Sequence, residues 1–172
     1  VAFWKGSRRT PDPSGGRHRT RSSRTRSRRY RLARALILLD TNVWSVLPHA
    51  GREPHVEKWI AERNHQIWLS VVAVAEIRIG IENPAASAKR EKLTEWLADL
   101  ELLYAKRILE FDLASAHVFG KLIAQKKLQK QETKLLDIQL AAQGLAHDCP
   151  IATRNVKDLA WTGVKLVNPW AV

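Results

Sequence analysis

The sequence has a single cysteine, Cys149, among its 172 residues. A lone cysteine excludes an intramolecular disulfide and is typical of a protein from a reducing compartment. No apolar run approaches the length of a membrane span, and the run between Arg34 and Asp40 is too short for a secretory signal. We therefore expect a soluble, cytoplasmic protein without a membrane segment.

Several common catalytic patterns are also missing from the sequence. It contains no glycine-rich phosphate-binding loop and no cluster of cysteine and histidine residues with the spacing of zinc ligands. The six histidines are scattered, and Ser70 has no obvious histidine or acid partner in the sequence. These absences argue against phosphate-loop, zinc-dependent and serine-nucleophile chemistry.

The net charge of +12 is concentrated at the N-terminus. Residues 1–34 contain twelve basic residues and one acid, Asp12, and so carry +11, whereas the remaining 138 residues carry only +1. The segment is rich in Arg, Ser and Gly and poor in large apolar side chains, a composition that predicts disorder. Three interpretations stay open: an arm that binds nucleic acid, an organellar transit peptide, or a non-native or mis-assigned start.

Residues 35–172 alternate short apolar runs with longer helical patterns, and we expect them to form one domain. The apolar runs predict strands at residues 36–39, 66–70, 108–111, 150–153 and 164–170. The longer patterns predict helices at residues 54–64, 71–83, 87–107, 112–128, 133–148 and 155–161. Strands separated by one or two helices, without hairpin signals, predict an α/β fold with a mostly parallel central sheet.

An acid stands directly after the first expected strand. Five apolar residues, 35–39, lead into Asp40, Thr41 and Asn42. Ligands of parallel α/β sheets bind at the carboxyl ends of the strands, so Asp40 occupies a position typical of a functional residue. A structural interpretation also stays open, in which Asp40 or Asn42 caps the helix that follows.

A second acid, Glu76, lies in the segment VVAVAEIRIGI, residues 71–81, where only Glu76 and Arg78 are polar. A helix that is apolar on most sides is expected to be buried, and a buried carboxylate is costly unless it is paired or binds a metal. Arg78 is a poor partner because residues two apart on a helix point to different faces. Gly80, one turn after Glu76, would let another backbone or a substrate come close.

A third acid, Asp137, has apolar and small residues three, four and seven positions later on its own helix face. A lone charge is unusual there, and the structural alternative is a salt bridge to Lys134 or Lys130. Further along, Asn155 follows an expected strand and Asp158 comes three residues later. This spacing fits a helix N-cap as well as a functional position.

Together these segments resemble a PIN-domain ribonuclease, and within that group a VapC-like toxin of bacterial toxin–antitoxin pairs. The matching segments are LLDTNVW at 38–44, LSVVAVAEIRIGIE at 69–82, LLDIQLAAQGLAHDCPIATRNVKDL at 135–159 and GVKLVNPW at 163–170. The resemblance covers residues 35–172 and implies a PIN-like nuclease domain, a three-layer α/β/α sandwich. Residues 1–34 have no counterpart in this pattern.

The resemblance also implies a catalytic site. It places the acidic cluster of the family on Asp40, Glu76 and Asp137, and a fourth, often acidic position on Asn155. In this family Mg²⁺ or Mn²⁺ is expected to bind the three acids, because these ions prefer oxygen ligands and activate water. The implied reaction is water-mediated cleavage of single-stranded or looped RNA.

Substrate contacts and partners are implied in the same way. Thr41 and Asn42 beside the first acid, together with Arg154 and Arg78, are the candidate substrate-binding residues, with solvated surface charge as the alternative for the arginines. A VapC-like toxin is expected to bind a small antitoxin and to form a homodimer. The helix at 87–107 is a candidate wall of the antitoxin groove through Trp96 and Tyr104, and core packing is the alternative.

Two other functions compete with the nuclease. A phosphatase of the haloacid-dehalogenase type also has an acid after its first strand, but it needs a second acid two residues later, where this chain has Asn42. A catalytically degenerate PIN module would bind RNA or a protein partner without cleavage, and the amide at Asn155 favours it. The presence of Asp40, Glu76 and Asp137 argues against it.

Overall fold

The computed structural model of the protein describes residues 36–49, 51–129 and 133–171. The chain divides into two units, residues 1–32 and 33–172, and every described residue belongs to the second. The predictions for the basic segment 1–34 therefore lie outside the described residues. No helix of the described residues has the length and apolar character needed to cross a membrane.

The described residues contain one five-stranded sheet in the order β3-β2-β1-β4-β5, and all of its strands run parallel. The strands are β1 (Ile37–Leu39), β2 (Ile67–Ser70), β3 (Ile108–Leu109), β4 (Ile151–Ala152) and β5 (Leu166–Val167). From β1 in the middle, the chain moves to one edge through β2 and β3. It then crosses to the other side of β1 for β4 and β5, which confirms the expected parallel sheet.

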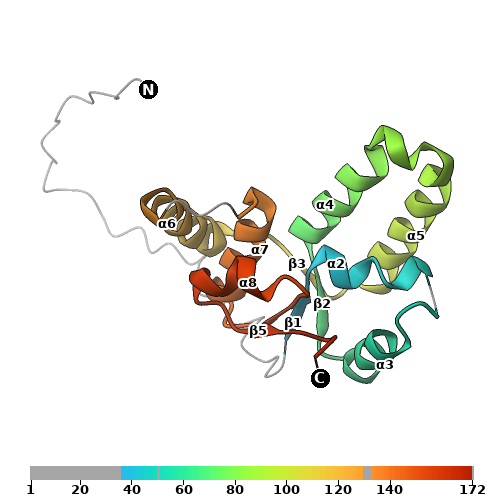
Figure 1. Ribbon diagram of the computed structural model, residues 1–172, viewed down its shortest axis with the longest axis horizontal. Coiled ribbons are helices and arrows are strands. Elements are labelled where there is room, and N and C mark those ends of the chain that lie inside the picture. The colour runs from blue at the N-terminus through green and yellow to red at the C-terminus, as the bar shows by residue number, and fades with distance from the viewer. Residues whose placement is uncertain (1–35, 50, 130–132, 172) are drawn as a thin grey trace, which may run out of the picture. The chain divides into compact units, whose positions relative to one another are not determined.

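Seven α-helices connect these strands in the described part of the chain. They are α2 (Thr41–Trp44), α3 (Pro54–Arg63), α4 (Val71–Glu82), α5 (Arg90–Leu103), α6 (Leu113–Gln129), α7 (Leu135–Ala146) and α8 (Val156–Leu159), with the 3-10 turns η1 (Leu47–His49), η2 (Pro84–Lys89) and η3 (Ala160–Thr162). Helices α3 and α5 lie on one side of the sheet and α6 and α7 on the other (Figure 1). The expected three-layer α/β/α sandwich is therefore confirmed.

The central strands are buried on both faces. Ile37 and Leu39 of β1 belong to a core shared with helices α2 to α5. Leu38, which points to the opposite face because side chains alternate along a strand, is also fully buried. On that face Ile151 of β4 packs against Gly144 of α7, where an added Cβ would lie 3.2 Å from the Ile151 Cδ1 atom. Burial on both faces explains why the first strand is a continuous apolar run.

The structure corrects the prediction that α4 is buried on most sides. Ile79 is 61% exposed, and a Cβ added at Gly80 would meet no atom within 4 Å. Arg78 is exposed on the same helix and pairs with Glu82 over 3.8 Å. The prediction was wrong because only one side of α4 packs against other described residues. That side carries the buried residues of the helix, Val72, Ala73, Ile77 and Ile81.

Several element boundaries also differ from the predictions, and two of the differences involve prolines. The first residues of the helix expected at 87–107 belong to the 3-10 turn η2, whose first residue is Pro84, and the α-helix begins only at Arg90. The strand expected at 164–170 pairs only through Leu166 and Val167, and residues 169–170 form a turn. Proline fixes the local backbone in both places, since Pro84 opens the 3-10 turn and Pro169 lies in the turn after β5.

Two aromatic residues, Trp96 in α5 and Tyr104 directly after it, pack into the core. The Tyr104 ring lies edge-on to Trp44, with centroids 5.3 Å apart, and its hydroxyl donates to Asn64 Oδ1 over 2.7 Å. Tyr104 is only 2% exposed, and Trp96 packs against the same core. The core-packing alternative is therefore correct for Tyr104, which is not available as the wall of an exposed groove.

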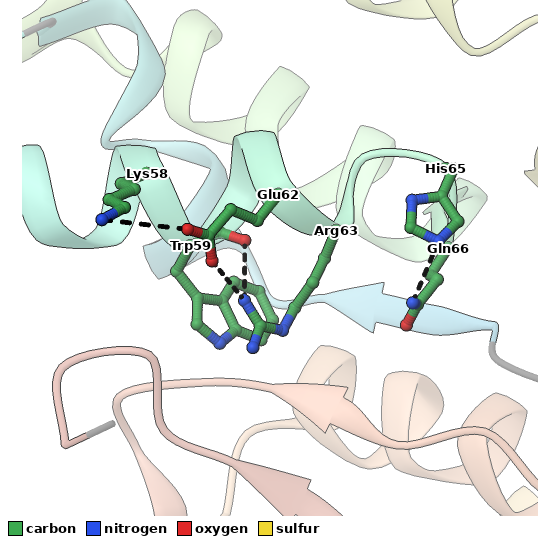
Figure 2. A network of polar contacts seen from close by, with 6 residues as sticks. All are labelled: Lys58, Trp59, Glu62, Arg63, His65 and Gln66. Carbon is green, nitrogen blue, oxygen red and sulfur yellow. Dashed lines mark hydrogen bonds and ion pairs between the residues drawn. The ribbon is translucent and has the colours of Figure 1, made fainter.

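A network of polar side chains at the end of α3 lies near the amino end of β2 (Figure 2). Lys58 and Arg63 contact Glu62 over 3.9 and 3.2 Å, and the Arg63 guanidinium lies 4.8 Å from the centre of the Trp59 ring. Exposed pairs of this kind contribute at most about 1 kcal/mol each. Since Gln66 precedes β2, the network lies at the amino ends of the strands, away from the edge at which parallel sheets bind ligands.

Candidate active site

The strand order creates a switch point between β1 and β4, where the chain changes its direction of travel across the sheet. Asp40 follows β1 and Thr153 follows β4, and the Thr153 hydroxyl donates to Asp40 Oδ2 over 2.6 Å. Both side chains are buried. Ligands of parallel α/β sheets bind in the crevice at such a switch point, so this edge is the candidate active site.

Asp40 is the most fully hydrogen-bonded of the acids. Its Oδ1 atom accepts from the Thr41 backbone N–H over 2.6 Å, and its Oδ2 atom accepts from Asn42 Nδ2 over 2.6 Å as well as from Thr153. Asp40 is also the N-cap of α2. The capping interpretation and the functional one are therefore both compatible with the same side chain.

The fold brings Asp40, Glu76 and Asp137 together from segments far apart in the sequence. One carboxylate oxygen of each lies within 4.8 Å of those of the other two. Asp40 follows β1, Glu76 lies in the second turn of α4, and Asp137 lies in the first turn of α7. Asp40 is buried and the other two are half-buried, so the cluster is open to solvent on one side.

Two buried polar residues fix the helices that carry Glu76 and Asp137. The Ser70 hydroxyl caps α4 by accepting from Val72 N over 3.0 Å, and it donates to Gln143 Oε1 of α7. The Gln143 amide donates in turn to the Leu109 carbonyl over 3.2 Å. Ser70 is therefore the N-cap of α4, as its position just before the helix predicts, and its bond to Gln143 joins α4 to α7.

The electrostatics of the cluster are unfavourable without a cation. Burial, followed by the charges of Asp40 and Glu76, raises the pKa of Asp137 from 3.8 to about 6. Asp158 raises this pKa as well, and Lys134 lowers it without offsetting the increase. Among the described residues no lysine or arginine forms an ion pair with Asp137. The alternative partner Lys130 lies outside the described residues.

Thr41 and Asn42 contact the acids themselves. The Thr41 hydroxyl donates to Glu76 Oε2, which connects α2 to α4. The Asn42 amide donates to Asp40, and to Thr153 over 3.1 Å, and its carbonyl oxygen accepts from the backbone N–H of residue 154 over 3.1 Å. The side chains that follow the first acid therefore orient the carboxylates.

The remaining predicted site residues are exposed to solvent. Arg154 follows Thr153, and its guanidinium lies 3.5 Å from Glu53. Asn155 occupies the N-cap position of α8, but its side chain makes no capping bond, and its backbone N–H donates to Thr153 Oγ1 over 2.9 Å. The expected cap position is therefore right and the expected side-chain bond is absent. Arg78 lies on the exposed side of α4.

Sequence reasoning did not assign a role to Thr153 or to Gln143, although both support the site. Thr153 is fully buried at the end of β4, directly across the switch point from Asp40. Gln143 is fully buried in α7 among small and apolar residues. A polar residue that ends a strand, and a glutamine inside an apolar helix, are the sequence signals that indicate such supporting roles.

Comparison with known proteins places the chain in one family. A model of the PIN domain matches residues 37–160, and the chain belongs to the PIN-domain family. It is 34% identical to the VapC ribonuclease Y4jK of Sinorhizobium fredii over 138 residues, which cover 78% of this chain and 98% of that protein. It is 31% identical to the toxin FitB of Neisseria gonorrhoeae over 137 residues, which cover 78% of this chain and 99% of FitB. The predicted resemblance is confirmed.

Solved structures agree with this assignment. A chain in the crystal structure of FitAcB from Neisseria gonorrhoeae superposes with a TM-score of 0.70 and 30% identity, over 80% of this chain and 100% of that chain. A chain of VapBC-5 from Mycobacterium tuberculosis, a member of the VapBC family of toxin–antitoxin systems, has a TM-score of 0.55 and 22% identity. It covers 78% of this chain and 98% of its own length, and it shares the fold.

Proposed function

We propose that this chain is a metal-dependent endoribonuclease that acts as the toxin of a toxin–antitoxin pair. The observation that carries the proposal is the convergence of Asp40, Glu76 and Asp137 at the switch point of a PIN fold. Relatives named as a ribonuclease and as a toxin support it, since nearly their whole length aligns with this chain.

The donor set fits Mg²⁺ or Mn²⁺. All three ligands are carboxylates, and a magnesium site typically takes one or two such groups from protein and keeps several waters. The raised pKa of Asp137 indicates that the protein itself leaves the negative charge of the cluster uncompensated. When bound, the ion would polarise a phosphoryl oxygen and lower the pKa of a bound water.

The residues around the acids would keep the cluster in shape. Asp40 is held by donors on both of its oxygens, and Glu76 is held by the Thr41 hydroxyl. Asn155 would offer an amide oxygen and no charge at the fourth position. Buttressed carboxylates need no reorientation when substrate arrives, which is the usual contribution of such neighbours to a metal site.

The substrate we propose is RNA, and the partners are a cognate antitoxin and a second copy of this chain in a cytoplasmic complex. Arg154 and Arg78 are both exposed, and we expect their guanidinium groups to contact the phosphates of the RNA. A domain whose net charge is near zero needs such local basic groups to hold a polyanion.

The proposal is tested by incubating the purified chain and its Asp40→Asn variant with total RNA in Mg²⁺, in Mn²⁺ or in EDTA. We expect cleavage in either metal, and its loss with EDTA and with Asp40→Asn. An intact protein that binds RNA but cleaves it in neither metal would favour the degenerate binding module. The toxin role is tested in bacteria, where expression should arrest growth and Asp40→Asn should restore it. Co-expression of the protein encoded next to the chain should also restore growth.

A further inference from the structure

Arg154 is fixed close to the acids through its backbone. Its N–H donates to the Asn42 side chain over 3.1 Å, and the same side chain donates to Asp40 Oδ2 over 2.6 Å. The preceding residue, Thr153, is itself bonded to Asp40. The start of the Arg154 side chain is therefore tied to the first acid of the cluster by a short chain of hydrogen bonds.

The guanidinium group of Arg154 is also held in place. It lies 4.5 Å from the centre of the Trp170 ring, and its Nη2 atom lies 3.5 Å from Glu53 Oε1. Trp170 is half-buried and packs against the core, so the ring is an anchored support. The Arg154 side chain is nevertheless 58% exposed. One face rests on an aromatic ring, one edge is paired with a carboxylate, and the rest is open to solvent.

This arrangement differs from that of Arg78, the other arginine proposed to contact the RNA. Arg78 pairs with Glu82 one turn later on α4 over 3.8 Å, and no aromatic ring of the described residues lies against its guanidinium group. Exposed pairs of that kind are weak and leave the side chain adaptable. Glu53 already balances the charge of Arg154, as Glu82 does for Arg78. What distinguishes Arg154 is that the Trp170 ring holds its planar guanidinium group in place.

We propose that Arg154 forms a binding subsite for an unstacked nucleobase next to the scissile phosphate, with Trp170 and Glu53 holding its guanidinium plane ready for stacking. The inference rests on the proposed RNA substrate. Unpaired bases in RNA stack on arginine planes as well as on aromatic rings, and the guanidinium group is planar and weakly hydrated. Lysine has the same charge without the plane, so Arg154→Lys separates stacking from phosphate binding.

The first test measures binding without cleavage, in EDTA. Fluorescence anisotropy compares the full chain with Arg154→Lys, Arg154→Ala and Arg63→Lys on two labelled probes, an adenine decamer RNA and an abasic ribose–phosphate decamer of equal charge. Base stacking predicts that both Arg154 variants weaken binding to the adenine decamer by about five- to a hundredfold. Arg154→Lys should bind the abasic decamer as the unmodified chain does. Arg63 also lies over a tryptophan ring and beside a glutamate, but at the amino ends of the strands, so Arg63→Lys is the matched control and should leave the preference for the base-bearing probe unchanged.

The second test reads the fragment ends after cleavage of total RNA in Mn²⁺. The unmodified chain should show a base preference beside the cut, and Arg154→Lys should flatten it. Full retention of affinity and preference by Arg154→Lys would overturn the subsite and leave Arg154 a phosphate contact. Equal binding of the two decamers by the unmodified chain would also overturn it. Absence of any cleavage by the unmodified chain would contradict the proposed function instead, and the binding test would still decide the subsite.

Discussion

Replacing Asp137 by asparagine should stabilise the metal-free protein at neutral pH. Burial and the neighbouring acids raise the Asp137 pKa from 3.8 to about 6, so the ionised carboxylate is unfavourable in the folded state. An increase of this size corresponds to about 3 kcal/mol at about 1.4 kcal/mol for each pH unit. Because Asp137 is half-exposed and solvent screens part of the repulsion, we expect a gain of about 1–1.5 kcal/mol in unfolding free energy from Asp137→Asn.

The pH dependence gives this gain a characteristic sign. A carboxyl group with a raised folded pKa favours the folded state below its unfolded pKa, and this contribution disappears as the pH rises through its folded pKa. The advantage of Asp137→Asn should therefore be full at pH 7.5 and fall by about half at pH 5, where the native carboxyl group is largely protonated. Urea unfolding in EDTA at the two pH values measures both differences.

Addition of Mn²⁺ should reverse the order of stability. An ion that binds only the folded state adds about 2.7 kcal/mol at a hundredfold excess over its dissociation constant, and Asp137→Asn should gain much less of this. Asp99→Asn, on the exposed side of α5, is the matched control and should change the free energy of unfolding by less than about 0.5 kcal/mol. Lower stability of Asp137→Asn at pH 7.5 in EDTA, or a difference independent of pH, would refute the argument.

Three further predictions concern one residue of the site and two glycines of the helices. Thr153→Val removes the hydroxyl that donates to Asp40 and should lower the RNA cleavage rate in Mn²⁺ by about ten- to a hundredfold. Thr153→Ser keeps a hydroxyl and should retain most of the rate. Equal rates for the two variants would contradict this role of Thr153. Gly144→Ala should lower the urea unfolding free energy by about 1–3 kcal/mol because its Cβ would lie 2.7 Å from Val164 Cγ2. Gly80→Ala, in open space, should instead raise it by about 0.5–1 kcal/mol, and destabilisation there would show that the position is constrained in the free protein.

Much of the fold could be predicted from local patterns because the relevant signals are local. The apolar run before Asp40 marks a strand buried on both faces, and Ser70 marks the start of the following helix. The burial of α4 could not be predicted in the same way. Apolar composition shows that a helix can be buried, but which side is covered depends on the packing of distant elements, and Ile79 is left exposed.

The acids of the candidate site could be located from the sequence because each is out of place in its own segment. Glu76 and Asp137 stand on helices with few other polar residues, and the resemblance to the PIN domain joined them to Asp40. The supporting residues could not be found in this way. Thr153 and Gln143 are ordinary polar residues in the sequence, and only the parallel pairing of β4 with β1 and the packing of α7 reveal their partners.

The central claim is that the clustered acids bind a divalent ion for RNA cleavage. It is tested most directly by comparing substitutions of two glutamates of α4, Glu76 inside the cluster and Glu82 outside it. The measurement is the rate of RNA cleavage as a function of Mn²⁺ concentration for the unmodified chain, Glu76→Gln and Glu82→Gln. Glu82 is exposed on α4 and pairs with Arg78, so it provides a matched control outside the cluster. We predict equal Mn²⁺ dependence for the unmodified chain and Glu82→Gln, and at least a hundredfold lower rate (roughly the upper limit for neighbouring residues of a metal site) for Glu76→Gln. Cleavage by Glu76→Gln at the unmodified rate, or cleavage that persists in EDTA, would contradict the account.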